Sequence, residues 1–448
     1  MNAERPLRAV QISSSDVGGG AERIAADLHR GSLARGIESR LAVGFRFGSG
    51  PGTVEIANDA KRTVWARAVL GLLPELPAPP ARLSAPSVVV RRGLKALAEP
   101  GRALRRAQGY EDFDYPGTAS LPALGGSPAD VLHLHSPHGG YFDLRCLPQL
   151  STQLPTVVTL HDTWLTSGHC AYTLECERWR TGCGACPHLD THPSVPRDRT
   201  AENWARKRDI LRRSRLHVVG PSRWVLGKAA DSILAAGAVE MRHIPNGVDQ
   251  GVFAPADRRA AREQLGIADG PLMLVFSAAT RGNLYKDEAT IAAALPAIVA
   301  RVAPRPVLFV SLGASADVAP APGVEARMVP FLSDPRGVAR YLQAADLVLH
   351  AARAENHPLA IIEAQSCGTP VVATDVGGIR ETLADGQSGL LVPLSDPAAL
   401  AEAASGLLLD DARRQAMGAA ALEHATAHFG LDRMVDAYVA LYHELASG

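Results

Sequence analysis

Two carboxylates in the last quarter of the sequence are the first candidates for chemistry. Glu355 and Glu363 stand with seven residues between them, directly after the apolar run ADLVLHAA. Glu355 is therefore expected on the loop that leaves a strand, and Glu363 two turns into the following helix. In α/β folds this edge of the sheet binds ligands, and the helix N-terminus directs backbone N–H groups to the same place. The backbone expected to be available for phosphate oxygens belongs to Asn356, His357, Pro358 and Leu359.

Four cysteines within 17 residues form a second candidate site. They are spaced C-x5-C-x6-C-x2-C and are Cys170, Cys176, Cys183 and Cys186. The closing C-x2-C is typical of half a zinc knuckle, whereas the opening C-x5-C is wider than zinc ribbons use. A structural zinc is one interpretation and reduced thiols packed against Trp179 are another, with disulfides third. Three nearby histidines, His133, His135 and His138, are expected to line a cleft or the core rather than to bind a metal.

Residues 61–106 are unusually basic. They hold ten lysines and arginines against Glu75 and Glu99, a net charge of +8. Apolar residues such as Trp65, Val69 and Leu72 recur among them at helical spacing. One interpretation is a solvated basic insertion. The other is a basic amphipathic surface that meets anionic lipid or an acceptor carrying a pyrophosphate.

The strands and helices that position these residues are predicted from the sequence pattern, in which short aliphatic runs alternate with Ala-rich amphipathic stretches. This alternation is typical of βαβ units and parallel sheets, and it occurs twice, which predicts two doubly wound domains. Pro245, Asn246 and Gly247 interrupt the pattern. We therefore expect one domain over residues 1–245, a second over 246–428 and a C-terminal helix over 429–448 that packs back on the first domain.

Composition excludes several classes of protein. The 448 residues carry 46 Lys and Arg against 46 Asp and Glu, so a general nucleic-acid binder, which has a basic excess, is not expected. The N-terminus MNAERPLRAV lacks the apolar run of a secretory signal, and six cysteines are too few for a disulfide scaffold. These features predict a cytoplasmic protein.

Several blocks of the sequence resemble one enzyme family. The run from Ala354 to Leu391 is similar to the E-x7-E block of retaining glycosyltransferases of the GT-B fold, family four. HLHSPHGGYFDLRCLPQL, VVGPSRW, IPNGVD and the cysteine-containing run resemble a bacterial branch of that family found in polysaccharide gene clusters. The resemblance covers nearly the whole chain. It implies two Rossmann-like domains that face each other across a cleft, the first binding the acceptor and the second the nucleotide sugar.

The resemblance also implies roles for single residues of the second domain. Glu355 matches the glutamate that approaches hydroxyls of the donor sugar, and Glu363 the one that holds the ribose. Lys286 matches the lysine that binds the donor diphosphate, and Arg281 is the candidate for its arginine partner. Where the family has Gly-Phe-Gly after the first glutamate, this chain has Asn356-His357-Pro358.

In the first domain the resemblance implies two contacts with the ligands. His161 matches a histidine that contacts the donor sugar or supports the reacting centre. Gly18, Gly19 and Gly20 match a glycine-rich turn in which a side chain would collide with the ligand.

The function implied is transfer of a sugar from a nucleotide-sugar donor to an acceptor hydroxyl with retention of configuration and without a catalytic metal. Cations and a helix N-terminus can neutralise the departing diphosphate. Front-face attack is favoured, and a double displacement through Asp162 is the alternative. The acceptor is either a glycan, which can be lipid-linked at the inner face of the membrane, or a soluble small molecule. A GT-B-shaped sugar-binding protein without catalysis is the alternative of another class.

Overall fold

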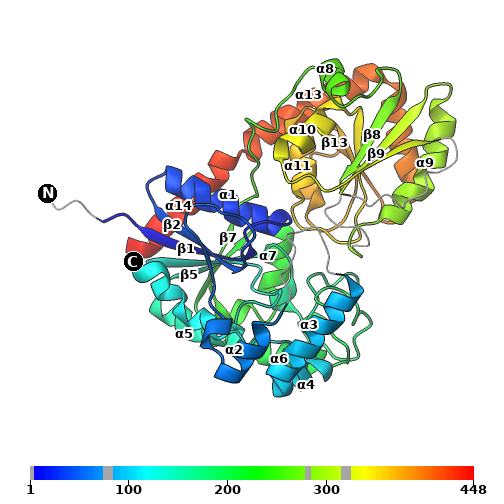
Figure 1. Ribbon diagram of the computed structural model, residues 1–448. Helices are drawn as coiled ribbons and strands as arrows, with labels where there is room; N and C mark the ends of the chain where they lie inside the picture. The colour runs from blue at the N-terminus through cyan, green and yellow to red at the C-terminus, as the bar shows by residue number, and fades with distance from the viewer. Residues whose placement is uncertain (1–4, 74–83, 278–283, 314–323, 448) are drawn as a thin grey trace. The chain divides into compact units, whose positions relative to one another are not determined.

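The computed structural model describes residues 5–73, 84–277, 284–313 and 324–447 (Figure 1). The chain divides into two compact units. Unit 1 consists of Met1–Ile244 and Val435–Gly448, and unit 2 of Pro245–Met434. Each unit has its own hydrophobic core and is described by itself.

Within the described residues, unit 1 contains a seven-stranded sheet in which neighbouring strands are parallel. The order across the sheet is β3-β2-β1-β4-β5-β6-β7. The strands are β1 (Arg8–Ser15), β2 (Glu38–Phe45), β3 (Thr53–Glu55), β4 (Val131–His135), β5 (Thr156–Thr159), β6 (Leu216–Gly220) and β7 (Ala238–His243). The order reverses between β1 and β4, which is the switch point of a doubly wound fold.

Helices cover both faces of this sheet. Figure 1 shows α1 and α14 over one face and α5 over the other. The helices of unit 1 are α1 (Gly20–Ala34), α2 (Val64–Leu70), α3 (Ala85–Ala98), α4 (Pro100–Ala107), α5 (Leu147–Gln153), α6 (Thr200–Leu211) and α7 (Arg223–Ala230), together with α14 (Leu431–Ser447) from Val435 onward.

Unit 2 repeats the architecture, with six strands among its described residues in the order β10-β9-β8-β11-β12-β13. The strands are β8 (Leu272–Ser277), β9 (Val307–Leu312), β10 (Glu325–Val329), β11 (Leu347–His350), β12 (Val371–Thr374) and β13 (Gly389–Val392). The helices are α8 (Arg258–Gln264), α9 (Glu288–Val302), α10 (Pro335–Ala344), α11 (Leu359–Ser366), α12 (Pro397–Leu409) and α13 (Asp411–His428). Its switch point lies between β8 and β11.

The sequence explains why these strands are central. Every residue of β4, β5, β9, β11 and β12 is buried, because helices cover both faces of a parallel sheet and each strand must be apolar on both sides. The prediction of two Rossmann-like α/β domains is confirmed. Among the described residues, no helix is both long enough and apolar enough to cross a lipid bilayer.

Candidate functional site

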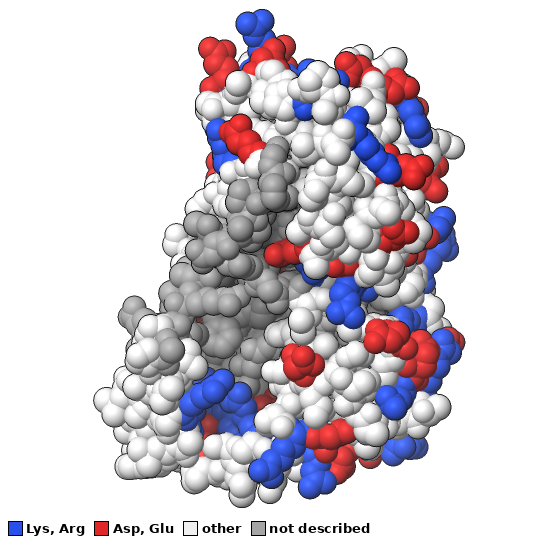
Figure 2. Space-filling view, turned by 90° about the vertical axis from the view of Figure 1, so that its right-hand side faces the viewer, with Lys and Arg blue, Asp and Glu red and all other residues white. Residues whose placement is uncertain are grey.

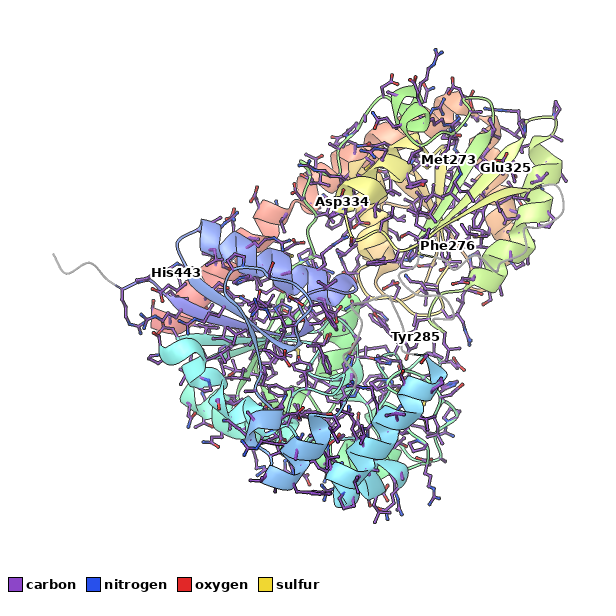
Figure 3. The ribbon with its side chains drawn as sticks, viewed as in Figure 1. Met273, Phe276, Tyr285, Glu325, Asp334 and His443 are labelled. Atoms are coloured by element: carbon purple, nitrogen blue, oxygen red, sulfur yellow. The ribbon has the colours of Figure 1, made fainter. Side chains whose placement is uncertain are left out.

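Backbone pairing brings Lys286 to Glu355 at the switch point of unit 2. The segment that enters α9 runs along the segment that leaves β11: Arg353 N–H donates to the Tyr285 carbonyl over 2.8 Å, and an isolated antiparallel bridge joins Lys286 to Ala352. Figure 3 labels Phe276 within β8 and Tyr285 beyond the end of this strand. As a result, the Lys286 ammonium and the Glu355 carboxylate form an ion pair.

His350 completes a charged cluster around Glu355. Its Nε2 lies 3.7 Å from Oε2 of Glu355. Burial alone would raise the pKa of Glu355, but Lys286 and His350 lower it to about 2. Burial and the charge of Lys286 lower the pKa of His350 to about 4. At neutral pH the cluster therefore consists of a carboxylate, an ammonium group and a neutral imidazole.

A Gly-Gly turn after β12 fixes the position of the loop that carries Glu355. Gly377 has φ of +61°, and a Cβ at this position would lie 1.9 Å from the Glu355 carbonyl oxygen. The next residue, Gly378, donates its N–H to the same oxygen over 3.1 Å. A side chain at Gly377 would therefore push the Glu355 loop away. The sequence revealed this pair only as a turn.

The residues between the two glutamates start helix α11. Asn356, His357 and Pro358 are buried, and Pro358 is the N-cap. The His357 carbonyl accepts a hydrogen bond from Asn246 Nδ2 over 3.1 Å, and its ring lies edge-on to Phe429 with centroids 5.3 Å apart. His357 therefore packs against unit 2 through its ring and is hydrogen-bonded through its carbonyl, and Asn356 is buried beside it.

The other predicted donor-site residues of unit 2 have different places. Glu363 is buried on α11, one residue after Ile362 of the core, and Leu359, the first residue of that helix, is partly buried. Arg281 lies outside the described residues. The structure thus joins Lys286 and Glu355 directly and places Glu363 just over one turn into the helix that follows them, rather than the two turns expected, because α11 begins only at Leu359.

In unit 1, His161 follows β5 and belongs to a buried hydrogen-bond network. Its Nε2 lies 3.0 Å from Nδ1 of His135, whose Nε2 lies 3.1 Å from Oε1 of Gln11. The Gln11 amide in turn donates to the Tyr442 hydroxyl over 2.9 Å. Because an amide oxygen only accepts, His135 carries its proton on Nε2, and His161 then donates from its own Nε2. Burial lowers the pKa of His161 to about 4, so its ring is neutral at pH 7.

The same network attaches α14 to the sheet. The Tyr442 hydroxyl lies 2.6 Å from Nδ1 of His133, and Nε2 of His133 lies 2.7 Å from the Thr159 hydroxyl. Thr159 also contacts the Tyr438 hydroxyl over 2.8 Å. His133 and His135 are therefore structural core residues whose polar atoms are paired, in agreement with their expected place in a core.

His138 and Asp162 form a second charged pair, which sequence reasoning missed. They follow the neighbouring strands β4 and β5, and Nε2 of His138 lies 2.6 Å from the Asp162 carboxylate. Burial opposes the charged form of His138, but Asp162 raises its pKa above the ordinary value. Asp162 also accepts the backbone N–H of Trp164 over 2.9 Å. The available signal was that both residues come just after strands predicted to be neighbours.

The glycines before α1 are not required by the backbone. None of Gly18, Gly19 and Gly20 has a positive φ. A Cβ at Gly18 would meet only the end of the Glu22 side chain, at 3.1 Å, and Glu22 accepts a hydrogen bond from Ser14 over 2.6 Å. Packing within the protein therefore does not explain glycine at positions 18 and 19.

The four cysteines are all free thiols and partly buried. Cys183 Sγ accepts the N–H of Gly168 over 3.3 Å, and Cys186 Sγ lies 3.5 Å from Nε2 of His169. Burial raises the pKa of Cys170 to about 11 and that of Cys183 to about 12. In the part of the chain that the structure describes, no group of three or more His, Cys, Asp or Glu residues is arranged to hold a metal ion. The arrangement gives the zinc interpretation no support.

Comparison with known proteins identifies relatives of part of the chain. Residues 275–410 match the sequence model of the family described as "Glycosyl transferases group 1". The chain is 35% identical over 236 residues to D-inositol 3-phosphate glycosyltransferase 1 of Catenulispora acidiphila, covering 49% of this chain and 56% of that protein. It is 27% identical over 337 residues to the putative colanic acid biosynthesis glycosyl transferase WcaC of Escherichia coli, covering 70% and 76%. The chain thus spans about half the length of the first of these relatives.

Solved structures share the fold over the whole chain. Sucrose-phosphate synthase from Thermosynechococcus elongatus aligns with a TM-score of 0.62 and 18% identity, covering 98% of this chain and 99% of that one. HepE from Anabaena, solved in complex with UDP and glucose, aligns with a TM-score of 0.62 and 17% identity, covering 98% and 100%. The fold is therefore that of GT-B glycosyltransferases, and the matched segment, 275–410, contains Lys286, Glu355 and Glu363.

Proposed function

We propose that this protein is a retaining, metal-independent glycosyltransferase that moves a sugar from a nucleotide-sugar donor to an acceptor hydroxyl in polysaccharide or glycoconjugate biosynthesis. The observation that carries the proposal is the ion pair of Lys286 and Glu355 at the switch point of unit 2, directly before helix α11. Its position in the segment similar to group 1 glycosyl transferases supports the same function. WcaC is described as a putative glycosyl transferase of colanic acid biosynthesis, and HepE has been solved in complex with UDP-glucose.

In this proposal unit 2 binds the donor. Lys286 has three N–H donors, so it can hold the Glu355 carboxylate and a phosphate oxygen of the donor at the same time. Glu355 accepts hydrogen bonds from hydroxyls of the donor sugar, and Glu363 accepts from the ribose. The first turn of α11, whose N-cap Pro358 makes no side-chain cap, adds backbone N–H groups for the diphosphate.

The charges of the cluster suit departure of a nucleoside diphosphate. Negative charge grows on the leaving oxygen as the bond to the sugar breaks, and Lys286 stands where it can neutralise that charge. In front-face attack the acceptor hydroxyl transfers its proton to the same oxygen as it bonds to the sugar carbon. His161, neutral at pH 7, acts as a hydrogen-bonding group. The Asp162 carboxylate, the alternative nucleophile, is already held by His138 and the N–H of Trp164, which favours the front-face route.

Helices α2, α3 and α4 support a peripheral contact with the cytoplasmic face of a membrane. A small cluster of Ala66, Val69, Leu70 and Ala98 joins α2 to α3. The large apolar side chains that remain exposed in this region are Val64, Trp65, Leu72, Val89, Val90, Leu97 and Leu104. Figure 2 shows Lys and Arg beside uncharged surface in the lower part of the molecule, where α3 and α4 lie in Figure 1. Exposed apolar groups beside basic ones favour an anionic lipid surface.

Donor turnover tests the function. We expect the full-length protein to hydrolyse or transfer sugar from at least one nucleotide sugar, and Glu355→Gln to abolish this reaction. The matched control is Glu325→Gln, since Glu325 is an exposed carboxylate of the same unit, on β10. Binding of nucleotide sugar without any turnover would instead indicate the non-catalytic sugar-binding protein. Sedimentation with anionic vesicles at low salt, reduced by Arg91→Glu with Arg92→Glu, tests the membrane contact.

A further inference from the structure

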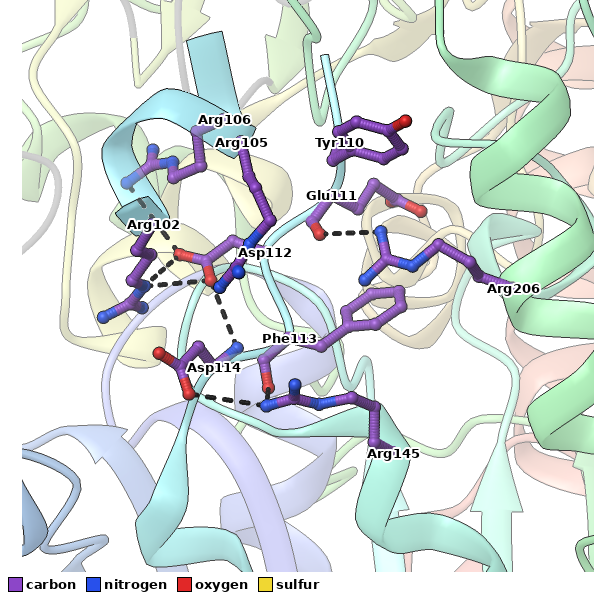
Figure 4. Close-up of a pocket in the computed structure, with 10 residues that line it drawn as sticks. All are labelled: Arg102, Arg105, Arg106, Tyr110, Glu111, Asp112, Phe113, Asp114, Arg145 and Arg206. Atoms are coloured by element: carbon purple, nitrogen blue, oxygen red, sulfur yellow. Dashed lines mark hydrogen bonds and ion pairs between the residues drawn. The ribbon is translucent and has the colours of Figure 1, made fainter. Parts of the chain in front are cut away.

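A cavity of about 330 Å³ lies in unit 1 beside α4, outside the residues assigned to the donor (Figure 4). Its walls come from α4, the loop that follows α4, the segment just before α5, and α6. The lining residues are Arg102, Arg105, Arg106, Tyr110, Glu111, Asp112, Phe113, Asp114, Arg145 and Arg206. Five guanidinium groups therefore surround one small space, against three carboxylates.

Two of these arginines are neutralised by carboxylates. Arg102 Nε lies 2.8 Å from the Asp112 carboxylate, and a second bond of 2.7 Å joins Arg102 to Glu99. Arg145 lies 2.7 Å from Asp143. Because these carboxylates neutralise Arg102 and Arg145, the two side chains contribute more to the shape of the cavity than to its net positive charge.

Glu111 also lines the cavity, but its carboxylate is bound by groups that do not line it. Its side chain forms an ion pair of 2.9 Å with the buried Lys207 and accepts a hydrogen bond of 2.6 Å from Trp164 Nε1. Arg206 donates a hydrogen bond to the backbone carbonyl of Glu111, and the Glu111 carboxylate acts on it only through its charge. The negative charge near the cavity is smaller than the count of acidic residues indicates.

Arg206 and Arg105 lack a carboxylate partner among the described residues. Arg206 donates to the Glu111 carbonyl over 3.1 Å and to the Asn203 side chain over 3.2 Å, both neutral acceptors. Burial lowers the pKa of Arg206; the charge of Glu111 opposes this shift, whereas the charges of Arg145 and Arg105 add to it. Arg106 reaches Asp112 only at 4.0 Å. Like charges thus converge on a partly desolvated space, an arrangement that a bound anion stabilises.

Aromatic rings supply the rest of the wall. The Arg206 guanidinium carbon lies 4.5 Å from the Phe113 ring centroid and 5.8 Å from that of Tyr110. Figure 4 shows the Arg206 side chain reaching in between these two rings. A free inorganic ion does not need such a wall, whereas an organic group attached to a phosphate can pack against it.

Trp164 connects the cavity to the end of β5. Its ring lies edge-on to Phe113, with centroids 6.4 Å apart, and 5.4 Å from the ring of His138 on its other side. Phe113 of the cavity wall and His138 of the His138–Asp162 pair therefore both contact Trp164.

We propose that this cavity binds the phosphate or diphosphate group of an organic ligand, through Arg105, Arg106 and Arg206. Planar guanidinium groups match the geometry of phosphate oxygens, and three of them around one space suit a dianion. The group belongs to the acceptor, either a soluble sugar phosphate or a lipid diphosphate. This identification of the acceptor rests on the proposed function, whereas anion binding by the cavity does not.

Calorimetry with inorganic pyrophosphate at low salt tests the site. The full-length chain carries Lys286→Gln throughout, so that the proposed donor site does not contribute. We expect Arg105→Gln with Arg206→Gln to weaken pyrophosphate binding by about tenfold or more, because two charge-assisted contacts are lost. The control Arg212→Gln removes an exposed arginine at the end of α6 that does not line the cavity, and it should leave the affinity unchanged.

Arg105→Gln alone is the second variant. Because Arg105 is exposed, this substitution buries no polar group and is not expected to unfold the protein. Equal affinity in this variant, the double variant and the parent overturns the proposal, as does a parent that fails to bind pyrophosphate. Nucleoside diphosphate binding, measured with Lys286 intact, should survive in the double variant. If the wild type itself does not bind nucleoside diphosphate, the proposed function is refuted, whereas the proposal of an anion site is not affected.

Vesicles distinguish the two sources of the phosphate group. Phosphatidylglycerol vesicles are compared with phosphatidylcholine vesicles, for wild type and for the double variant. If the double variant no longer sediments with phosphatidylglycerol vesicles, and pyrophosphate releases the wild type from them, the cavity binds a lipid headgroup. Unchanged sedimentation, together with weakened pyrophosphate binding, assigns it to a soluble phosphorylated acceptor.

Discussion

At the carboxyl edges of the two sheets, the side chains that follow β11 in unit 2 and β5 in unit 1 differ in charge. In unit 2, β11 is followed by a partly buried carboxylate held by Lys286, directly before the N-terminus of α11. In unit 1, β5 is followed by His161, a neutral imidazole in a chain of hydrogen bonds that ends on α14. The same topology thus presents cations and N–H groups in one unit and neutral donors in the other.

The difference teaches how one fold can serve two kinds of ligand. A departing diphosphate needs charge, which unit 2 supplies, whereas hydroxyl groups of a sugar need oriented hydrogen bonds, which unit 1 can supply without desolvating a charge. In unit 1 the charged groups lie beside this chain, in the His138–Asp162 pair, and in the arginine-lined cavity.

The largest effect is expected where unit 2 would lose its cation. Lys286→Ala should lower kcat on the order of 10²- to 10³-fold, the typical cost of removing one electrostatic donor at a developing charge. The substitution also leaves the buried Glu355 without its partner, so Tm should be measured in parallel with steady-state turnover. Turnover near that of the wild type in a folded variant would remove Lys286 from the diphosphate role.

A pair of glycine substitutions tests how rigidly the Glu355 loop must be held. Gly377→Ala places a Cβ against the Glu355 carbonyl, while Gly386→Ala meets nothing within 4 Å, although both positions have positive φ, +61° and +76°. Both variants should lose about 1 kcal/mol of stability for the backbone conformation. Only Gly377→Ala should lose a further amount of about 1–3 kcal/mol from overpacking, together with donor affinity. Denaturant unfolding and donor titration decide, and equal losses in the two variants would contradict the role of the turn.

Glu363 tests whether unit 2 recognises the nucleoside as well as the diphosphate. Glu363→Ala should weaken nucleoside diphosphate binding by about 1.5–3 kcal/mol, because a ribose diol loses a charged acceptor. Isothermal titration of the wild type and of the variant measures this difference. Because Glu363 is buried, a thermal melt must first show that the variant is folded; unchanged affinity would then exclude the ribose contact.

Sequence patterns predicted the features that depend on near neighbours in the chain. The strands are readable because a parallel sheet needs apolar runs, and the place of Glu355 after a strand follows from such a run. The contacts that define the site come from distant residues: Lys286 is 69 positions from Glu355, and Tyr442 is 309 positions from His133. Spacing within a motif carries no information about which segment pairs with it, so the ion pair, the role of Gly377 and the histidine network could not be read from the sequence.

The smallest effect concerns the pH dependence of stability, and it compares His161 of unit 1 with Glu355 of unit 2. Burial lowers the pKa of His161 from 6.5 to about 4, so the unfolded chain binds this proton first as the pH falls. Stability from the neutral ring is complete above pH 6.5 and is lost progressively down to about pH 4. In unit 2, burial opposes ionisation of Glu355, but Lys286 and His350 lower its pKa from 4.5 to about 2. Its contribution is complete above pH 4.5 and is lost down to about pH 2.

Each group therefore contributes a slope of at most about 1.4 kcal/mol per pH unit, in a different window. Urea unfolding between pH 7 and pH 2 should show that His161→Gln flattens the dependence between pH 6.5 and pH 4, and that Glu355→Gln flattens it below pH 4.5. Because the units form separate cores, their transitions should be followed separately, by tryptophan fluorescence for unit 1, where Trp164 packs beside His138. A slope between pH 6.5 and pH 4 that is the same in His161→Gln and in the wild type would show that His161 is not held neutral by its burial, since the slope that remains belongs to other buried histidines such as His133 and His135.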